Sequence, residues 1–226
     1  MARLETQINQ IYLTHPENKK TSLILYEEAV TSSFHLFIVA ELKDIVRKSE
    51  GSDLKKISEI ILESFRSNKK LSAESLFEQA LSQINQNLAD LAHEGHKSWV
   101  GKFSCLIMLK SSDNIFLAND GQTAAWLKRK NELLEILPPE KRGLHPLKTF
   151  VNFTQGKLIE GDGVIITTAN IFNYISFELL SRILNQSNML ASTEEISKIL
   201  KDSGAADQAF CAFLLEFAKK TIAARN

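Results

Sequence analysis

The chain has 226 residues, of which 44% are hydrophobic and 24% charged, so it suits one large globular domain or two small ones. Lys plus Arg and Asp plus Glu number 27 each, so no overall charge attracts nucleic acid or an anionic membrane. Residues 1–10 lack the apolar core of a signal peptide, and no stretch approaches the roughly 20 apolar residues of a spanning helix. We therefore expect a cytoplasmic protein that binds neither nucleic acid nor a membrane through this chain.

The two cysteines, Cys105 and Cys211, both lie in apolar, strand-like runs. This placement indicates buried free thiols in a reducing compartment. A disulfide or redox pair is the alternative.

The first forty residues are typical of strands, with two β-rich runs at 21–30 and 33–41. Amphipathic helices are then predicted at 53–67, with Ser52 as N-cap, and at 72–94, opened by Ser72. Each has one apolar stripe and one polar face, so each should cover a sheet.

Strands return after the second helix, and Asp120-Gly121 between two of them predicts a hairpin turn, because both residues tolerate positive φ. The later helices should cover 177–185 and 192–201, the second with Ser192 and Glu195 spaced as a capping box. The strands predicted in this part of the chain are 102–110, 114–119, 122–130, 132–137, 163–168 and 208–217.

This order predicts an α+β fold of two mainly antiparallel sheets packed face to face. The helices at 53–67 and 72–94 should lie on one outer face and the helices after Ile171 on the other. We expect one domain at 1–218 and a tail or linker start at 219–226.

Several motifs occur in a fixed order along nearly the whole chain. An apolar strand ends in Glu41-Leu42, a middle turn reads Ala118 to Thr123 (ANDGQT), a third segment runs from Gly161 to Asn170 (GDGVIITTAN), and Asp207-Gln208 precedes the last strand. In this order the chain resembles the metal-dependent Ser/Thr protein phosphatases (PPM type), especially their small bacterial branch. The resemblance implies a four-layer α-β-β-α sandwich. An unrelated α+β domain is the alternative.

The resemblance also implies which residues would hold metal. Two divalent ions in such enzymes activate a water and clamp the phosphoryl group, and hard Mg²⁺ or Mn²⁺ needs several oxygen ligands. Glu41 stands where the family has the bridging Asp, Leu42 replaces a ligand glycine, and Ala169 replaces the second aspartate. Asp207 alone keeps the family residue, so Glu41 and Asp207 would be the residual metal ligands. All three positions, 41, 169 and 207, should converge at one end of the sandwich.

These departures favour a catalytically impaired domain, a pseudophosphatase that binds a protein partner or a phosphorylated segment, with no cofactor. The alternative is a weak phosphatase that uses Mg²⁺ or Mn²⁺ at an altered site formed by Glu41 and Asp207. Without a ligand role, Glu41 would be a solvated residue at a strand end and Asp207 a turn or cap residue.

Two further candidates have ordinary structural explanations. His93 and His96 could bind a metal, but Gly95 is expected to end the helix there, where histidines meet the negative end of its dipole. Gly161 to Gly163 could hold a phosphate, but a turn before a strand explains it better.

Overall fold

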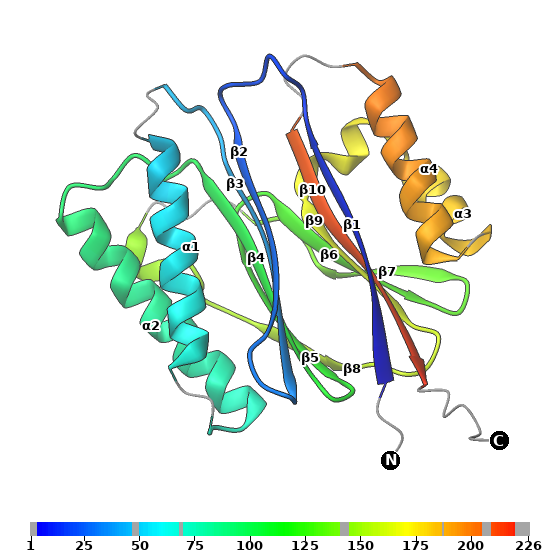
Figure 1. Cartoon of the computed structure of the whole chain (residues 1–226), viewed down its shortest axis with the longest axis horizontal. Helices are drawn as coiled ribbons and strands as arrows, with labels where there is room; N and C mark the ends of the chain where they lie inside the picture. The colour runs from blue at the N-terminus through cyan, green and yellow to red at the C-terminus, as the bar shows by residue number, and fades with distance from the viewer. Residues whose placement is uncertain are drawn as a thin grey trace.

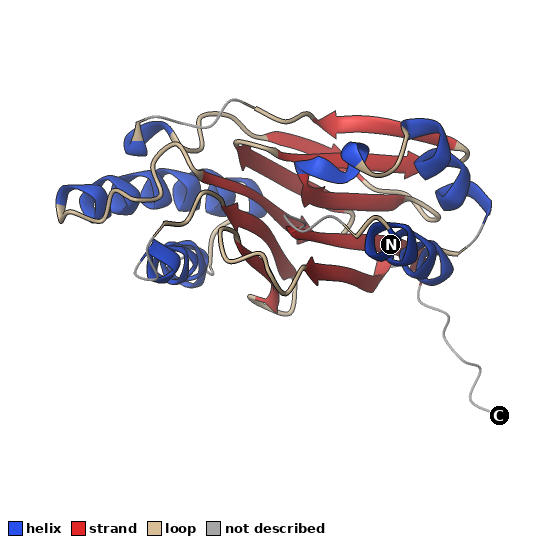
Figure 2. Ribbon diagram, turned by 90° about the horizontal axis from the view of Figure 1, so that it is seen from above, coloured by secondary structure: helices blue, strands red, loops and turns tan. Residues whose placement is uncertain are grey.

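The structure, a computed structural model, describes residues 4–46, 50–67, 70–140, 145–186, 188–204 and 209–219. Over these residues the chain forms two antiparallel sheets packed face to face, with helices on both outer faces (Figures 1 and 2). This arrangement confirms the α-β-β-α sandwich.

The first sheet has the strand order β2-β3-β4-β5-β8 in the described chain, and the helices α1 (Glu50–Arg66) and α2 (Ala73–His93) cover its outer face. Its central strands are buried along almost their whole length, because helices cover one face and the other sheet the second. The strands are β2 (Ser22–Ala29), β3 (Phe34–Leu42), β4 (Phe103–Ser111), β5 (Asn114–Asp120) and β8 (Thr154–Lys157).

The second sheet has the order β1-β10-β9-β6-β7 over the described residues, and α3 (Phe177–Gln186) and α4 (Met189–Asp202) cover its outer face. Its strands are β1 (Leu4–Thr14), β6 (Thr123–Arg129), β7 (Glu132–Leu137), β9 (Gly163–Thr168) and β10 (Ala209–Lys219). Pairing of β1 with β10, from Leu4 opposite Lys219 to Thr14 opposite Ala209, places the first and last described strands side by side.

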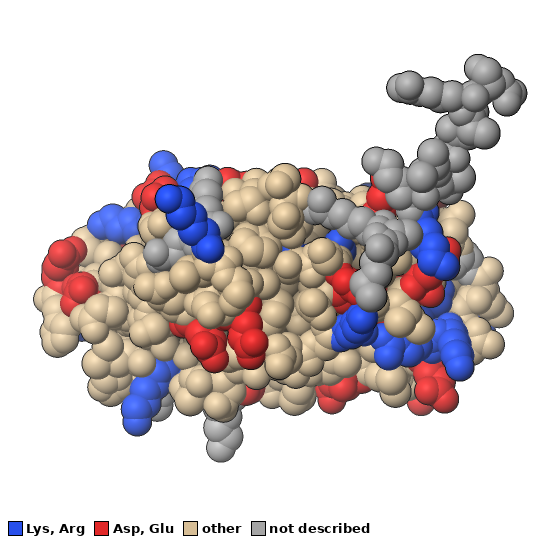
Figure 3. Space-filling view, turned by 90° about the horizontal axis from the view of Figure 1, so that it is seen from below, with Lys and Arg blue, Asp and Glu red and all other residues tan. Residues whose placement is uncertain are grey.

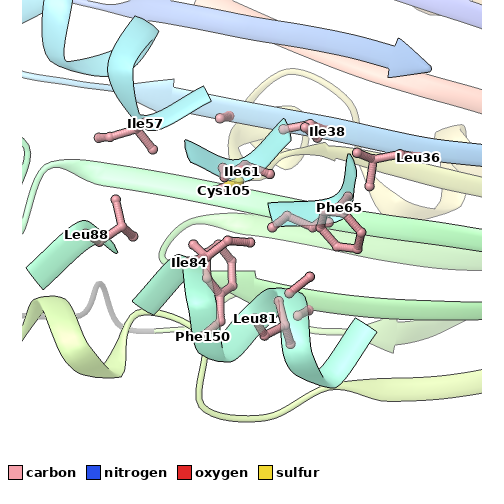
Figure 4. Close-up of a cluster of buried hydrophobic side chains, with 14 of the residues drawn as sticks. Leu36, Ile38, Ile57, Ile61, Phe65, Leu81, Ile84, Leu88, Cys105 and Phe150 are labelled. Atoms are coloured by element: carbon pink, nitrogen blue, oxygen red, sulfur yellow. The ribbon is translucent and has the colours of Figure 1, made fainter. Parts of the chain in front are cut away.

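Three hydrophobic layers follow from this stacking. One lies under α1 and α2, where Ile57, Ile61 and Phe65 of α1 face Ile84 and Leu88 of α2 (Figure 4). A second lies between the sheets, and a third lies under α3 and α4. Side chains of β3 alternate between the first two layers, as the period of two in a strand requires.

The hairpin predicted at Asp120-Gly121 is wrong, because β5 and β6 belong to different sheets. Gly121 has a φ of 73°, but Asp120 is the last residue of β5 and keeps strand geometry. The Asn119 amide donates to the carbonyls of Thr123, at 3.1 Å, and Pro138, at 2.9 Å. The motif is therefore a crossover between the sheets, which needs the same positive-φ glycine as a hairpin.

Of the three predicted capping residues, one is confirmed and two are wrong. Ser72 caps α2 by accepting a hydrogen bond from the Ser75 N–H. Ser52 lies inside α1, which begins at Glu50. The capping box at Ser192 is also wrong, because α4 begins earlier, with Asn188 accepting from the Ala191 N–H at 2.9 Å.

Two elements lie outside the predicted ranges or were not delimited. β8 lies between the strands predicted at 132–137 and 163–168, where no strand was predicted, together with the 3₁₀ turn η1 (Pro146–Lys148). β1 occupies residues whose strand had no predicted bounds. At the other end, β10 continues through Lys219, the first residue assigned to the tail. Within the described chain, no helix is both long and apolar enough to cross a membrane.

Candidate functional site

The expected site lies at one end of the layer between the sheets, where β3 ends, β9 ends and β10 begins. Thr168, the last residue of β9, accepts a hydrogen bond from the Cys211 N–H of β10 at 3.2 Å. The Cys211 thiol in turn lies 3.9 Å from the carbonyl oxygen of Ala40 on β3. The three strand ends that carry the family motifs are therefore in contact across the two sheets.

Only part of the predicted convergence of positions 41, 169 and 207 can be followed in the described residues. Asp207 and Gln208 lie outside them, and for residues 169 and 170, which open the 3₁₀ turn η2 (Ala169–Asn173), only the backbone is described. Convergence of Glu41, Ala169 and Asp207 therefore stays a prediction, supported by the contact between Ala40, Thr168 and Cys211.

Glu41 is buried and is not the solvated strand-end residue of the alternative interpretation. It pairs with Leu23 of β2 and Ser104 of β4, and has the strand parity of Phe37 and Val39, whose side chains fill the layer between the sheets. Its side chain is 1% exposed. A carboxylate in such a place requires a compensating positive charge.

Lys43 supplies a positive charge at Glu41. Its Nζ lies 3.1 Å from Glu41 Oε1, and the lysine side chain is 22% exposed. The pairing follows from the chain itself, because residues two apart in extended backbone point to the same side. Lys43 is not among the site residues expected from the sequence, although its spacing of two from Glu41 is a signal that points to it.

The lysine backbone is fixed by its neighbours. Its N–H donates to the Lys102 carbonyl at 3.2 Å, which continues the β3–β4 pairing by one residue. Asp44 follows with a φ of 55°, a conformation that Asp tolerates better than most residues, and the Ile45 N–H donates to the Lys20 carbonyl at 2.9 Å. The loop after β3 is thereby attached both to β4 and to the β1–β2 loop.

A cavity of about 620 Å³ opens at the same end of the molecule. Its wall includes Lys43 and Asp44 after β3, and Asn173 and Tyr174 after β9. The remaining lining comes from the β1–β2 loop and from the start of β10, namely Glu17, Asn18, Lys19, Lys20, Thr21 and Ala209. Three lysines and two carboxylates line it, so the wall carries no uniform negative charge that would attract a divalent cation.

Both cysteines are free and buried, as predicted. Burial raises the pKa of the Cys211 thiol, and the charge of Glu41 raises it further. Burial likewise raises the pKa of Cys105, with a smaller contribution from Asp120.

The described residues do not fit a two-metal centre. No cluster of three or more His, Cys, Asp or Glu side chains able to hold a metal ion occurs among them. Glu41 already has an ammonium group at 3.1 Å. A hard divalent cation needs several oxygen ligands, and one carboxylate paired to a lysine does not provide them.

The two other candidates have structural roles. His96 lies 3.3 Å from Asp53 and 2.8 Å from Lys56 Nζ, so it joins α1 to the turn after α2. That helix ends at His93, and Gly95 follows it with a φ of 99°. The expectation that Gly95 ends the helix is confirmed.

The segment from Gly161 to Gly163 is a turn leading into β9, as expected. Asp162 within it is 1% exposed and accepts hydrogen bonds from Arg129 at 2.7 and 3.0 Å and from the Ile159 N–H at 2.8 Å. Its carboxylate therefore stabilises the turn and does not face a phosphate.

Comparison with known proteins gives a clear result for the fold only. No family model matches the sequence, and no curated protein matches it. Among solved structures, PppA, a regulatory component of the type VI secretion system (T6SS) in Pseudomonas aeruginosa, superposes with a TM-score of 0.73 at 12% identity, covering 96% of this chain and 100% of that one.

Two other similar structures contain metal. The catalytic domain of the phosphatase PstP, in complex with two manganese ions, has a TM-score of 0.70 at 12% identity and covers 97% of this chain and 100% of its own. RsbX in complex with magnesium has a TM-score of 0.62 at 17% identity, covering 96% and 100%.

The chain therefore has the fold of the PP2C, or PPM-type, metal-dependent Ser/Thr phosphatases, as its motif order indicates. At these identities the likeness establishes the architecture and not the chemistry.

Proposed function

We propose that this chain is a pseudophosphatase, a PP2C-like domain that has lost metal-dependent hydrolysis and acts as a regulatory binding module. One observation carries the proposal: the Glu41 carboxylate, at the position of the family's bridging ligand, is paired to Lys43 at 3.1 Å. Ala169, which has no ligand atom in its side chain, replaces the second expected carboxylate.

The proposed ligand is a protein partner or a phosphorylated segment. The regulatory role named for PppA supports a place for this fold in regulation. Figure 3 shows one face of the molecule with basic and acidic side chains next to one another, an arrangement that does not favour a nucleic acid. The free, buried cysteines agree with a reducing compartment, so we propose the cytoplasm as its location.

The direct test is hydrolysis of p-nitrophenyl phosphate by the purified protein in millimolar Mn²⁺ or Mg²⁺. We expect no turnover above that of a Glu41→Gln variant, which serves as the matched control for trace contamination. Metal-dependent turnover that Glu41→Gln abolishes would contradict the proposal and favour the alternative, a weak phosphatase with an altered site at Glu41 and Asp207.

A restored variant tests the motif assignment. Changing Glu41→Asp, Leu42→Gly, Ala169→Asp, Asn170→Gly and Gln208→Asn together should restore divalent-metal binding measured by calorimetry, provided that Lys43→Met is added to free the carboxylate. A folded variant, verified by circular dichroism, that binds no metal would count against the assignment of these positions.

A further inference from the structure

A buried carboxylate at the end of the inter-sheet layer needs a cation, whatever its source. Glu41 is 1% exposed at its side chain, and a single negative charge there is compensated by a single ammonium charge. A divalent ion added beside this pair would repel the lysine and leave positive charge in excess. Among the described residues, the Glu41–Lys43 pair therefore does not fit two divalent ions.

The cation is held in place by the chain. Lys43 is attached through its N–H to Lys102, and the loop after it is attached through Ile45 to Lys20. The Lys102 side chain also donates to the Asp44 carbonyl at 2.9 Å. These contacts fix the backbone from which the Lys43 side chain reaches Glu41.

We propose that Lys43 is the built-in cation of this site, so that the chain itself compensates the charge of Glu41 and the stability of the fold does not depend on divalent metal. The proposal deepens the pseudophosphatase assignment on which it rests, because it says what replaced the metal. It assigns Lys43 a positioning role at Glu41 and no catalytic one.

The test is the melting temperature of matched variants in 5 mM MnCl₂, in 5 mM MgCl₂ and in EDTA. For the unmodified protein we expect the same value in all three to within about 1 °C, since a ligand that does not bind the native state does not shift the transition. A clear rise of its melting temperature with Mn²⁺ would overturn the proposal.

Lys43→Met removes the charge and keeps the length of the side chain. Its melting temperature should fall by about 5 °C, because the buried carboxylate loses the ammonium group beside it, and Mn²⁺ should not recover the loss, since Glu41 does not supply the several oxygen ligands that a hard divalent cation needs. Lys43→Arg, which keeps a cation, should remain insensitive to metal. Lys20→Met, which removes an exposed lysine from the same cavity wall, should change neither value.

The double variant Glu41→Gln/Lys43→Met keeps the test valid if Lys43→Met does not fold. Without the buried charge this variant should fold. Its melting temperature should be close to that of the unmodified protein and the same in Mn²⁺ as in EDTA. A double variant as unstable as the single one, or a Lys43→Met variant as stable as the unmodified protein, would overturn the proposal.

The outcome separates this proposal from the proposed function. An unmodified protein that is stabilised by Mn²⁺ but does not hydrolyse p-nitrophenyl phosphate would contradict the built-in cation and leave the pseudophosphatase assignment standing. Metal-dependent hydrolysis would contradict the assignment itself.

Discussion

Two buried carboxylates, Glu41 and Asp162, are held by cations of their own chain in different ways. Glu41 has the flexible ammonium of a lysine two residues further on, whereas Asp162 has the planar guanidinium of Arg129 from another strand. The guanidinium binds both carboxylate oxygens, and a backbone N–H adds a third bond. At the residue scale, Asp162 is therefore the more strongly constrained of the two.

Asp162→Ala should lower the free energy of unfolding by about 3 kcal/mol, because the Arg129 guanidinium loses its carboxylate partner and the Ile159 N–H loses its acceptor. Urea denaturation measures the change. Asp113→Ala is the matched control, since its pair with Lys157, at 3.4 Å, is largely exposed and should be worth less than about 1 kcal/mol. Equal losses in the two variants would contradict the role given to Asp162.

The two thiols give a prediction for pH. Burial raises the pKa of both Cys105 and Cys211 in the folded protein, so above the unfolded value, near 9, only the unfolded chain releases these protons. The stabilising contribution of the thiols is complete below that pH and is lost as the pH rises.

Between pH 9 and 10 the unfolding free energy should therefore fall by up to about 1.4 kcal/mol for each thiol. Urea denaturation midpoints at the two pH values would measure this fall. The Cys105→Ala/Cys211→Ala variant retains the titration of the other groups, and its fall should be smaller. An identical pH dependence in the two proteins would contradict the prediction.

At the scale of elements, the boundaries of α4 show how a capping signal is decided. Asn188 and Ser192 are both good N-cap residues, and the sequence alone favoured Ser192 because of Glu195 three positions later. Met189 and Ser192 are buried in the folded chain, and the Ser192 hydroxyl donates to the Ile183 carbonyl at 3.2 Å. Packing against α3 therefore moves the start of the helix to Asn188.

Asn188→Ala should lower the unfolding free energy by about 1 kcal/mol, because the Ala191 N–H loses its acceptor. Glu195→Ala, at an exposed position inside the helix, should change it by less than about 0.5 kcal/mol. Chemical denaturation of both variants measures the two losses of unfolding free energy. A larger loss for Glu195→Ala than for Asn188→Ala would support the capping box at Ser192 instead.

Helices and strands with a strong hydrophobic pattern could be predicted from the sequence, but the strands with which they pair in a sheet could not. The apolar runs of β3, β4 and β10 were located correctly because burial on both faces leaves few polar residues in them. Asp120-Gly121 was assigned to a hairpin, since the residues of a turn do not show whether the next strand joins the same sheet. β8 was missed because the segment TQGK has no apolar pattern.

For the whole molecule, the order of helix blocks and strand meanders determined the four layers correctly. Two helices precede β4 and two follow β9, and each pair covers the sheet that it flanks in the chain (Figure 1). The site was less accessible to such an argument. Glu41 was identified from its motif, but its partner Lys43 belongs to no motif, and only the burial of the carboxylate shows that a cation is needed there.

The central proposal, that this PP2C-like domain binds no divalent metal in its native state, is tested most directly by calorimetric titration of Mn²⁺ into the unmodified protein. We expect no heat beyond dilution, which corresponds to no site with a dissociation constant below about 1 mM. Saturable binding of two ions per chain in the micromolar range would contradict the account.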